Sequence, residues 1–147
     1  MVAVLGSIDI DRPVDEVFDF VADQRNEPSY NPQMTSSEKL TDGPIGAGTR
    51  FRAVMQMRGR SLPMEIEFTD LDRPHRLASR TTGAGSQVVG QLTFQPVGRG
   101  TRMTWDWDVR FGGPVRWLSP IVVWIGRRQE REIWTGLKHL LEHDPGH

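Results

Sequence analysis

Cysteine is absent from this sequence of 147 residues. Its absence excludes disulfide bonds, thiolate nucleophiles and thiolate metal ligands. A chain without cysteine is typical of a reducing compartment, and we predict a cytoplasmic location. The length is typical of one domain, so we expect residues 1–147 to form a single domain around one hydrophobic core.

Long apolar runs and an excess of charge are also lacking. No segment reaches about 18 consecutive apolar residues, so no transmembrane helix is predicted. The opening stretch, MVAVLGSIDIDRP, has neither a basic start nor a long apolar run, and it predicts a first strand rather than a signal peptide. The formal net charge of -1 supplies no field that would attract a polyanion, so we predict no nucleic-acid partner.

Strict alternation is the strongest pattern that is present, and it is clearest in the stretch TWDWDVRF at residues 104–111. Side chains of a strand point to opposite faces in turn, so Trp105 and Trp107 share one face while Asp106 and Asp108 share the other. The pattern predicts a half-buried strand. It leaves open whether the two indoles fill a solid core or line a hollow.

Shorter alternating segments precede the tryptophan strand and are separated by turns rich in glycine and proline. We expect strands over residues 2–11, 34–41, 49–57, 62–68, 76–82 and 87–97, with 34–41 at an edge. Because a few residues join each strand to the next after residue 34, the six or seven strands predict an antiparallel, meandering sheet.

Three helical segments complete the pattern. Apolar residues recur at spacings of three and four over 14–22, which predicts a short amphipathic helix, and 23–32 predicts a turn with a very short second helix. A long helix is expected from about residue 115 to His143, with Ser119-Pro120 as an internal cap or kink. Its predicted apolar stripe consists of Val115, Leu118, Val122, Ile125, Ile133, Leu137 and Leu140.

Four local phrases carry a resemblance to a known family. They are IDRPVDEVFDFVAD at 10–23, GAGTRF at 46–51, DRPHRL at 72–77 and GLKHLLE at 136–142. Together with the element order, they make the chain resemble the polyketide cyclase and dehydrase family, also described as lipid-transport-like, within the START and birch-pollen-allergen-like superfamily. The resemblance covers nearly the whole chain. It implies an α+β helix-grip fold, in which a curved antiparallel sheet with two short helices after its first strand wraps around a long C-terminal helix.

The resemblance also implies a cavity between the sheet and the long helix, and this gives the predicted ligand site. Sheet residues that face space left open by the helix are expected to be Met55, Met57, Met64, Ile66, Trp105 and Trp107. We add Tyr30, Phe51, Val122 and Gln129 as predicted ligand-binding residues. For each of them the alternative is a place in a solid core. Methionine adapts to irregular shapes, which favours a pocket of tolerant specificity.

Catalytic and metal motifs are weak. His139-Leu140-Leu141-Glu142-His143 fits the H-x-x-E-H zinc pattern, but a third ligand is missing, and we predict a solvated helix end, no metal and no cofactor. His75 is expected to be exposed in a turn. Acid–base chemistry would need a polar side chain in the cavity, and the residues considered for it are Tyr30, Gln129, Asp19 and Glu27.

A second apolar face on the long helix is less expected. Trp117, Ile121 and Trp124 lie opposite the main stripe, so the helix is apolar nearly all round between residues 115 and 125. Three explanations are open: burial by loops or the short helices, a homodimer contact, or contact with a membrane surface, for which neighbouring arginines are suited.

The leading functional hypothesis is therefore a protein that binds or transports a hydrophobic small molecule such as a lipid, a polyketide or an isoprenoid-like compound. The first alternative is a cyclase or dehydratase that uses the same cavity. The second is a protein-interaction module with a solid core, which the absence of a cavity above about 150 Å³ would favour.

Overall fold

The structure is a computed structural model that describes residues 2–57, 59–83, 85–111 and 119–143, apart from the side chains of Val2, Met57, Phe111 and residues 119–127. One strand is followed by two short helices, six further strands and a long helix. The elements are β1 (Val2–Ile10), α1 (Val14–Ala22), the 3₁₀ helix η1 (Gln24–Ser29), β2 (Met34–Lys39), β3 (Arg50–Met57), β4 (Arg60–Asp72), β5 (Arg76–Gly83), β6 (Ser86–Val97), β7 (Gly100–Phe111) and α2 (Ser119–His143).

All seven strands form one antiparallel sheet in the order β1-β7-β6-β5-β4-β3-β2. The run from β2 to β7 is the predicted meander, with β2 at one edge. The other edge is β1, which pairs with β7 although the two are far apart in the sequence, and this pairing places Gly6 opposite Trp105. Sequence alternation does not reveal this long-range pairing, because it carries no information about which strand lies beside which.

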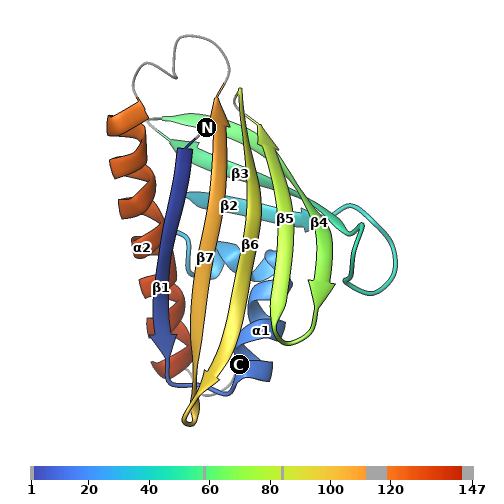
Figure 1. The fold of residues 1–147 in the computed structure, drawn as a ribbon. Helices are drawn as coiled ribbons and strands as arrows, with labels where there is room; N and C mark the ends of the chain where they lie inside the picture. The colour runs from blue at the N-terminus through green and yellow to red at the C-terminus, as the bar shows by residue number, and fades with distance from the viewer. Residues whose placement is uncertain (1, 58, 84, 112–118, 144–147) are drawn as a thin grey trace.

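The sheet curves strongly, and α2 runs along its β1 edge (Figure 1). Register shifts occur between Met34 and Ser36 in β2 and between Phe68 and Asp70 in β4. Irregularities of this kind bend a strand and increase its twist. The concave face therefore encloses a space that α2 covers from one side, while η1 packs on β2 and α1 packs on β6 and β7.

One part of this enclosed space is solidly packed. Phe18 of α1 meets Phe94 of β6 edge to face, with ring centroids 5.1 Å apart. Met103 of β7 and Leu137 and Leu141 of α2 are fully buried in the same hydrophobic core. Aromatic and aliphatic side chains of this kind supply most of the burial free energy of a small domain.

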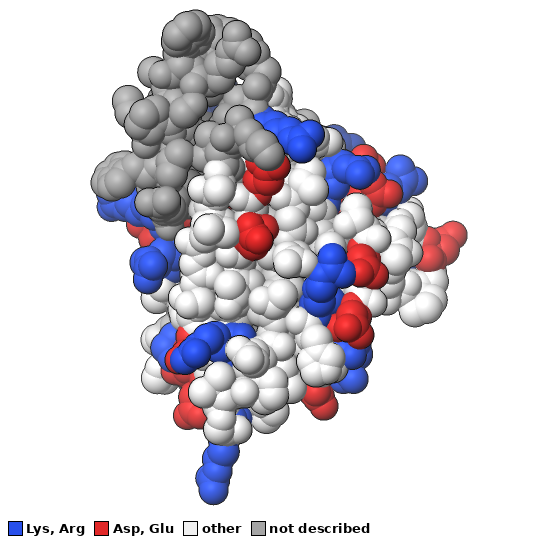
Figure 2. Space-filling model, in the orientation of Figure 1, with Lys and Arg blue, Asp and Glu red and all other residues white. Residues whose placement is uncertain are grey.

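The outer face of the sheet carries charges of both signs. Figure 2 shows acidic and basic side chains mixed over this face, without one sign gathered in a single area. Several of them pair directly across neighbouring strands: Arg102 with Asp9 at 2.9 Å, and Arg80 with Glu67 at 3.3 Å. The alternation that buries one side of each strand therefore leaves a solvated, electrically balanced side opposite.

The predicted fold class is confirmed: the chain has an α+β helix-grip fold with a seven-stranded antiparallel sheet, two short helices and a long C-terminal helix. The buried stripe of α2 differs in detail from the prediction, because it is centred on Trp134, Leu137 and Leu141, while Ile133 and Leu140 are only partly buried. Within the described residues, no helix combines the length and the apolar character needed to cross a bilayer.

Candidate functional site

A cavity of about 250 Å³ lies between the concave face of the sheet and α2. Residues from η1, from every strand between β2 and β7, and from α2 contribute to its wall. The interior is therefore hollow at this end and packed at the other. The volume lies between the about 150 Å³ of an apolar cavity that holds one benzene ring and the about 300 Å³ at which pockets for drug-sized ligands begin.

Most of the wall is apolar. Three methionines supply much of it, and the indoles of Trp107 and Trp134 lie on the β7 and α2 sides. Apart from the indoles, the large apolar lining residues include Met34, Met55, Met64, Ile66, Leu77 and Ile133. Such a wall favours an apolar ligand, and its methionines can adapt to several ligand shapes.

One part of the wall is polar and comes from η1, the segment after it, and α2. Its members are Gln24, Glu27, Asn31, Gln33, Gln129 and Glu130. The Asn31 amide donates to Glu27 Oε2 at 2.9 Å, and the Gln129 amide donates to Gln33 Oε1 at 3.0 Å. The second bond ties α2 to the segment between η1 and β2, so the two acids are held on elements that are linked to each other.

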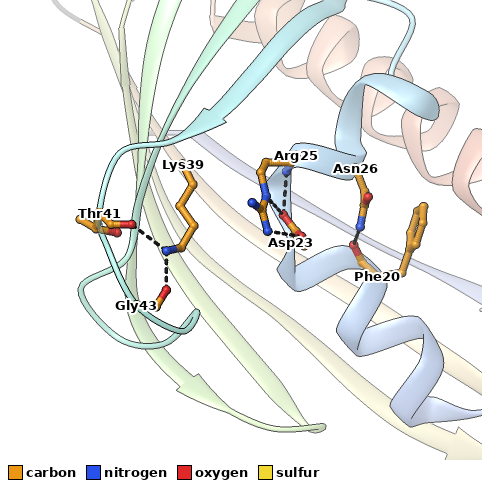
Figure 3. A network of polar contacts seen from close by, with 7 residues as sticks. All are labelled: Phe20, Asp23, Arg25, Asn26, Lys39, Thr41 and Gly43. Carbon is orange, nitrogen blue, oxygen red and sulfur yellow. Dashed lines mark hydrogen bonds and ion pairs between the residues drawn. The ribbon is translucent and has the colours of Figure 1, made fainter.

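Figure 3 shows the polar contacts at the turn from α1 into η1, just before Glu27 in the sequence. Asp23 caps η1 by accepting a hydrogen bond from the Arg25 backbone N–H at 3.1 Å, and it also accepts two from the Arg25 guanidinium at 2.8 Å. The Asn26 amide donates back to the Phe20 carbonyl oxygen at 3.0 Å. These hydrogen bonds fix the turn between α1 and η1. Glu27 and Asn31 come after this turn, and both line the cavity.

A close approach between α2 and the end of η1 positions the second acid. A Cβ atom at Gly136 would lie 2.6 Å from the Tyr30 carbonyl oxygen, so only glycine allows this separation. Earlier on the same helix, Glu130 faces the cavity and accepts a hydrogen bond from the Trp134 indole N–H at 2.6 Å.

The surroundings of Glu130 change its acidity. The pKa of this carboxyl is raised from 4.5 to about 7, mainly by burial, with a smaller contribution from the neighbouring charge of Glu27. The Trp134 N–H, and more weakly the Trp107 N–H, lower the pKa by favouring the carboxylate. Within the described structure, the Trp107 N–H nevertheless completes no hydrogen bond of normal geometry. Near neutral pH the group is therefore a mixture of acid and carboxylate, able to donate or to accept a proton.

Glu27 and Tyr30 lie in the same electrostatic environment. Burial raises the pKa of Glu27, and the hydrogen bond from Asn31 opposes this rise. Burial also raises the pKa of Tyr30 well above its usual value of 10, with Glu27, Glu130 and Asp23 adding to the rise in that order. The Tyr30 hydroxyl has no hydrogen-bond partner in the described part of the chain.

The structure brings together half of the residues predicted to bind a ligand. The side chains of Met55, Met64, Ile66, Trp107 and Gln129 all line the cavity. They come from β3, β4, β7 and α2, so the predicted alternation and the predicted placement of the long helix put them on one inner surface.

Three of the predicted residues lie elsewhere. Phe51 is fully buried against Phe68, with ring centroids 5.3 Å apart, and Trp105 is 2% exposed with its ring centroid 6.2 Å from that of Trp134. Tyr30 is buried beside Trp134. None of these three belongs to the cavity wall among the described residues, because neighbouring side chains occupy the space in front of their rings.

Several further predictions cannot be placed. The side chains of Met57 and Val122 lie outside the described residues. The same holds for Trp117 and for the side chains of Ile121 and Trp124, on which the expected homodimer or membrane contact depends.

Glu130 is the acidic residue of the described cavity wall that sequence reasoning missed. It lies four residues before Trp134 and seven before Leu137, so it belongs to the buried stripe of α2 although it is charged. A carboxyl on the apolar face of a helix is the signal that could have identified it. Glu27, considered as an acid near the cavity mouth, does line the wall, whereas Asp19 pairs with Arg73 at 2.7 Å on the surface.

The H-x-x-E-H segment has other contacts. Glu142 accepts hydrogen bonds from the Asp11 backbone N–H at 2.8 Å and from the Lys138 ammonium at 2.6 Å. His139 and His143 are exposed, with ring centroids 4.5 Å apart. Among the residues that the structure describes, no group of three or more histidine, aspartate or glutamate side chains is arranged to hold a metal ion. His75 is exposed, as expected of a turn residue.

Comparison with known proteins identifies a family that matches this chain. A family model described as polyketide cyclase / dehydrase and lipid transport matches residues 1–142. No curated protein sequence matches the chain significantly.

Solved structures share the fold at low sequence identity. A protein from Thermus thermophilus is 22% identical with a TM-score of 0.79, and the match covers 97% of this chain and 99% of that one. A START superfamily protein from Mycobacterium smegmatis is 16% identical with a TM-score of 0.81, covering 96% and 97%. The Zhui aromatase/cyclase from Streptomyces sp. R1128 is 16% identical with a TM-score of 0.74, covering 98% and 97%.

Proposed function

We propose, from the premise that this chain belongs to the polyketide cyclase, dehydrase and lipid-transport family, that it binds a small hydrophobic molecule between its sheet and α2. The observation that carries the proposal is the cavity of about 250 Å³ with its largely apolar wall. At about 24 cal/mol per Å³, space of that size left empty costs up to about 6 kcal/mol, and water at the polar end reduces this cost. A ligand that fills the cavity should therefore stabilise the fold.

Filling the cavity with a side chain tests the proposal. Ala53 of β3 is fully buried and lines the cavity, so Ala53→Phe should occupy part of the space and weaken binding of octanol and toluene at least about tenfold. Gln56→Phe is the matched control, because Gln56 lies on the same strand with its side chain exposed. Binding is measured by calorimetry and by the rise in melting temperature, and native mass spectrometry identifies compounds that co-purify.

If octanol and toluene bind equally well to the wild type and to a folded Ala53→Phe variant, they bind outside the cavity and the proposal is wrong. If neither probe binds the wild type and no compound co-purifies, the proposal is also wrong.

A second candidate function is acid–base catalysis in the same cavity, and the pKa of about 7 for Glu130 favours it. A positioned acid or base of this kind contributes a rate factor of about a hundred or more. Turnover of short β-diketones measures this catalytic contribution. Glu130→Gln should lower kcat by about a hundredfold or more and leave binding of neutral ligands unchanged. If turnover is absent, or is unchanged in Glu130→Gln, this second candidate is rejected. The cytoplasmic location and the homodimer contact remain predictions.

A further inference from the structure

The ionisable side chains described in the cavity wall are all acidic. The described residues of this wall include two carboxyl groups, Glu27 and Glu130, and no lysine, arginine or histidine. The remaining polar side chains in the wall are neutral amides and hydroxyls, such as Gln33, Asn31 and Ser79. A ligand that enters this space therefore meets negative charge and no positive charge from the described wall.

Neither acid is neutralised by a cation among the described side chains. Glu27 accepts its hydrogen bond from the Asn31 amide, and Glu130 accepts one from the Trp134 indole. The arginine on η1, Arg25, is paired with Asp23 at 2.8 Å. Buried charges are normally paired, because an unpaired one loses its hydration without compensation.

A further unsatisfied group lies next to the two acids. Tyr30 is only 5% exposed, yet its hydroxyl has no hydrogen-bond partner in the described structure. Its ring centroid lies 6.0 Å from that of Trp134, which lines the cavity. Buried polar groups without partners are rare in native proteins. This hydroxyl lies behind the cavity wall, close enough to Glu27 and Glu130 for their charges to raise its pKa.

Aromatic rings accompany the acids. Trp107 and Trp134 line the cavity together with Glu130, and indole rings are the side chains that attract cations most strongly. Carboxylates combined with indoles are a common arrangement for recognising an organic ammonium group, since the acids balance the charge and the rings contact the alkyl substituents.

We propose that the ligand is a small apolar amine, bound as its ammonium ion with the charged end at Glu27 and Glu130 and the apolar part among Met55, Met64 and Ile66. This inference rests on the proposed binding function and specifies its ligand class. A carboxylate or phosphate ligand would add negative charge beside two carboxyl groups whose ionised forms burial already disfavours. A neutral alcohol supplies no charge to pair with an ionised Glu27 or Glu130, whereas an ammonium group supplies both a positive charge and several hydrogen-bond donors.

Three probes with the same alkyl tail test the head group: octylamine, octanol and octanoate. Each is titrated into the intact protein near neutral pH by calorimetry. Octylamine should bind about tenfold or more tightly than octanol, and octanoate should bind most weakly. In Glu130→Gln and in Glu27→Gln, the preference for octylamine over octanol should fall to about twofold or less.

Glu132→Gln is the matched control. Glu132 lies two residues from Glu130 on α2, but it is exposed and pairs with Arg128 at 3.2 Å, so this variant should keep the preference of the wild type for the amine. A loss of the preference in Glu132→Gln as large as that in Glu130→Gln would show that general surface charge causes it, and would overturn the proposal.

The wild type provides a test that needs no variant. Glu130 is partly protonated at neutral pH and faces Glu27 from η1, Trp107 from β7 and Trp134 from its own helix, with Tyr30 nearby. Octylamine binding should therefore release protons, and octanol binding should not. Titrations in two buffers with different heats of ionisation measure this release.

The outcomes separate this inference from the proposed function. If octanol binds in the cavity and octylamine shows neither a preference nor proton release, the amine inference is wrong and the binding function stands. If none of the three probes binds, the proposed function fails and the inference fails with it.

Discussion

Trp105 and Trp107 lie two residues apart on the same face of β7, yet their surroundings differ. Trp105 is 2% exposed, and a Cβ atom at Gly6 on the neighbouring strand would lie 2.3 Å from its ring. Trp107 is half-buried and lines the cavity. The difference arises from the partners: Trp134 of α2 packs against Trp105, while open space remains in front of Trp107.

The same contrast applies to the whole space between sheet and helix. At the packed end, side chains such as Phe18, Met103 and Leu137 fill the volume. At the hollow end, polar and apolar side chains surround unfilled volume and two acids carry raised pKa values. The packed end stabilises the fold, and the hollow end is available for a ligand at some cost in stability.

The first prediction, with the largest expected effect, compares the stability lost on truncating one side chain at the packed end and one at the hollow end. Leu137 is fully buried, so Leu137→Ala should lower the free energy of unfolding by about 2–5 kcal/mol through lost burial and a new cavity. Met64 borders space that is already open, and Met64→Ala should cost about 1 kcal/mol or less in the absence of ligand. Denaturant unfolding measures both variants. Equal losses would contradict the division into a packed and a hollow end.

The second prediction concerns the buried acid at the hollow end. Because its folded-state pKa is raised to about 7, Glu130 holds its proton more tightly in the folded chain than in the unfolded one. Its contribution is therefore favourable at low pH and is lost as pH rises from about 4.5 to about 7. Glu130→Gln removes this loss and should stabilise the protein above pH 7 by about 3 kcal/mol at most, since the side chain retains some exposure.

The measurement is denaturant unfolding of wild type and Glu130→Gln at several pH values. The difference between them should shrink towards pH 4.5, because Glu130 is then largely protonated in the folded state and its raised pKa no longer costs stability. Glu132→Gln, at an exposed position of the same helix, should show no comparable pH dependence. A constant difference across the pH range would mean that burial of Glu130 does not raise its pKa.

The smallest effect tests the tight fit around Trp105. Gly6→Ala would place a methyl group within 2.3 Å of the indole, and relief by movement of β1 or of the ring should cost about 1–3 kcal/mol. Gly46→Ala is the control, because a Cβ atom at that position meets nothing within 4 Å. A stability of Gly6→Ala equal to that of the control would show that Trp105 is less confined than its burial indicates.

Local pattern was sufficient for most of the fold. Alternation predicted the strands to within a few residues, and the three- and four-residue spacing predicted α1 over Val14–Ala22 as observed. For the site, the parity of Met55, Met64, Ile66 and Trp107 put these residues on the inner face correctly. The pattern could not separate cavity from core, because Phe51 and Trp105 have the same parity and the same apolar character as the residues that line the cavity.

The meeting of the two cavity acids and their raised pKa values both depend on contacts between segments that are distant in the sequence. Glu27 and Glu130 come from η1 and α2. The approach of Gly136 to Tyr30, the ring contact between Tyr30 and Trp134 and the bond between Gln129 and Gln33 bring these elements together. Their raised pKa values follow from that burial, since an isolated glutamate in either helix would be hydrated.

The sequence by itself determined which residues form strands and helices and which side of each faces inward, because these depend on periodicity along the chain. Only the tertiary structure decided where the inner space is filled and where it stays open, because this depends on how far α2 reaches over a sheet that brings its first and last strands side by side. The difference between Trp105, which α2 covers, and Trp107, which faces the cavity, follows from that reach.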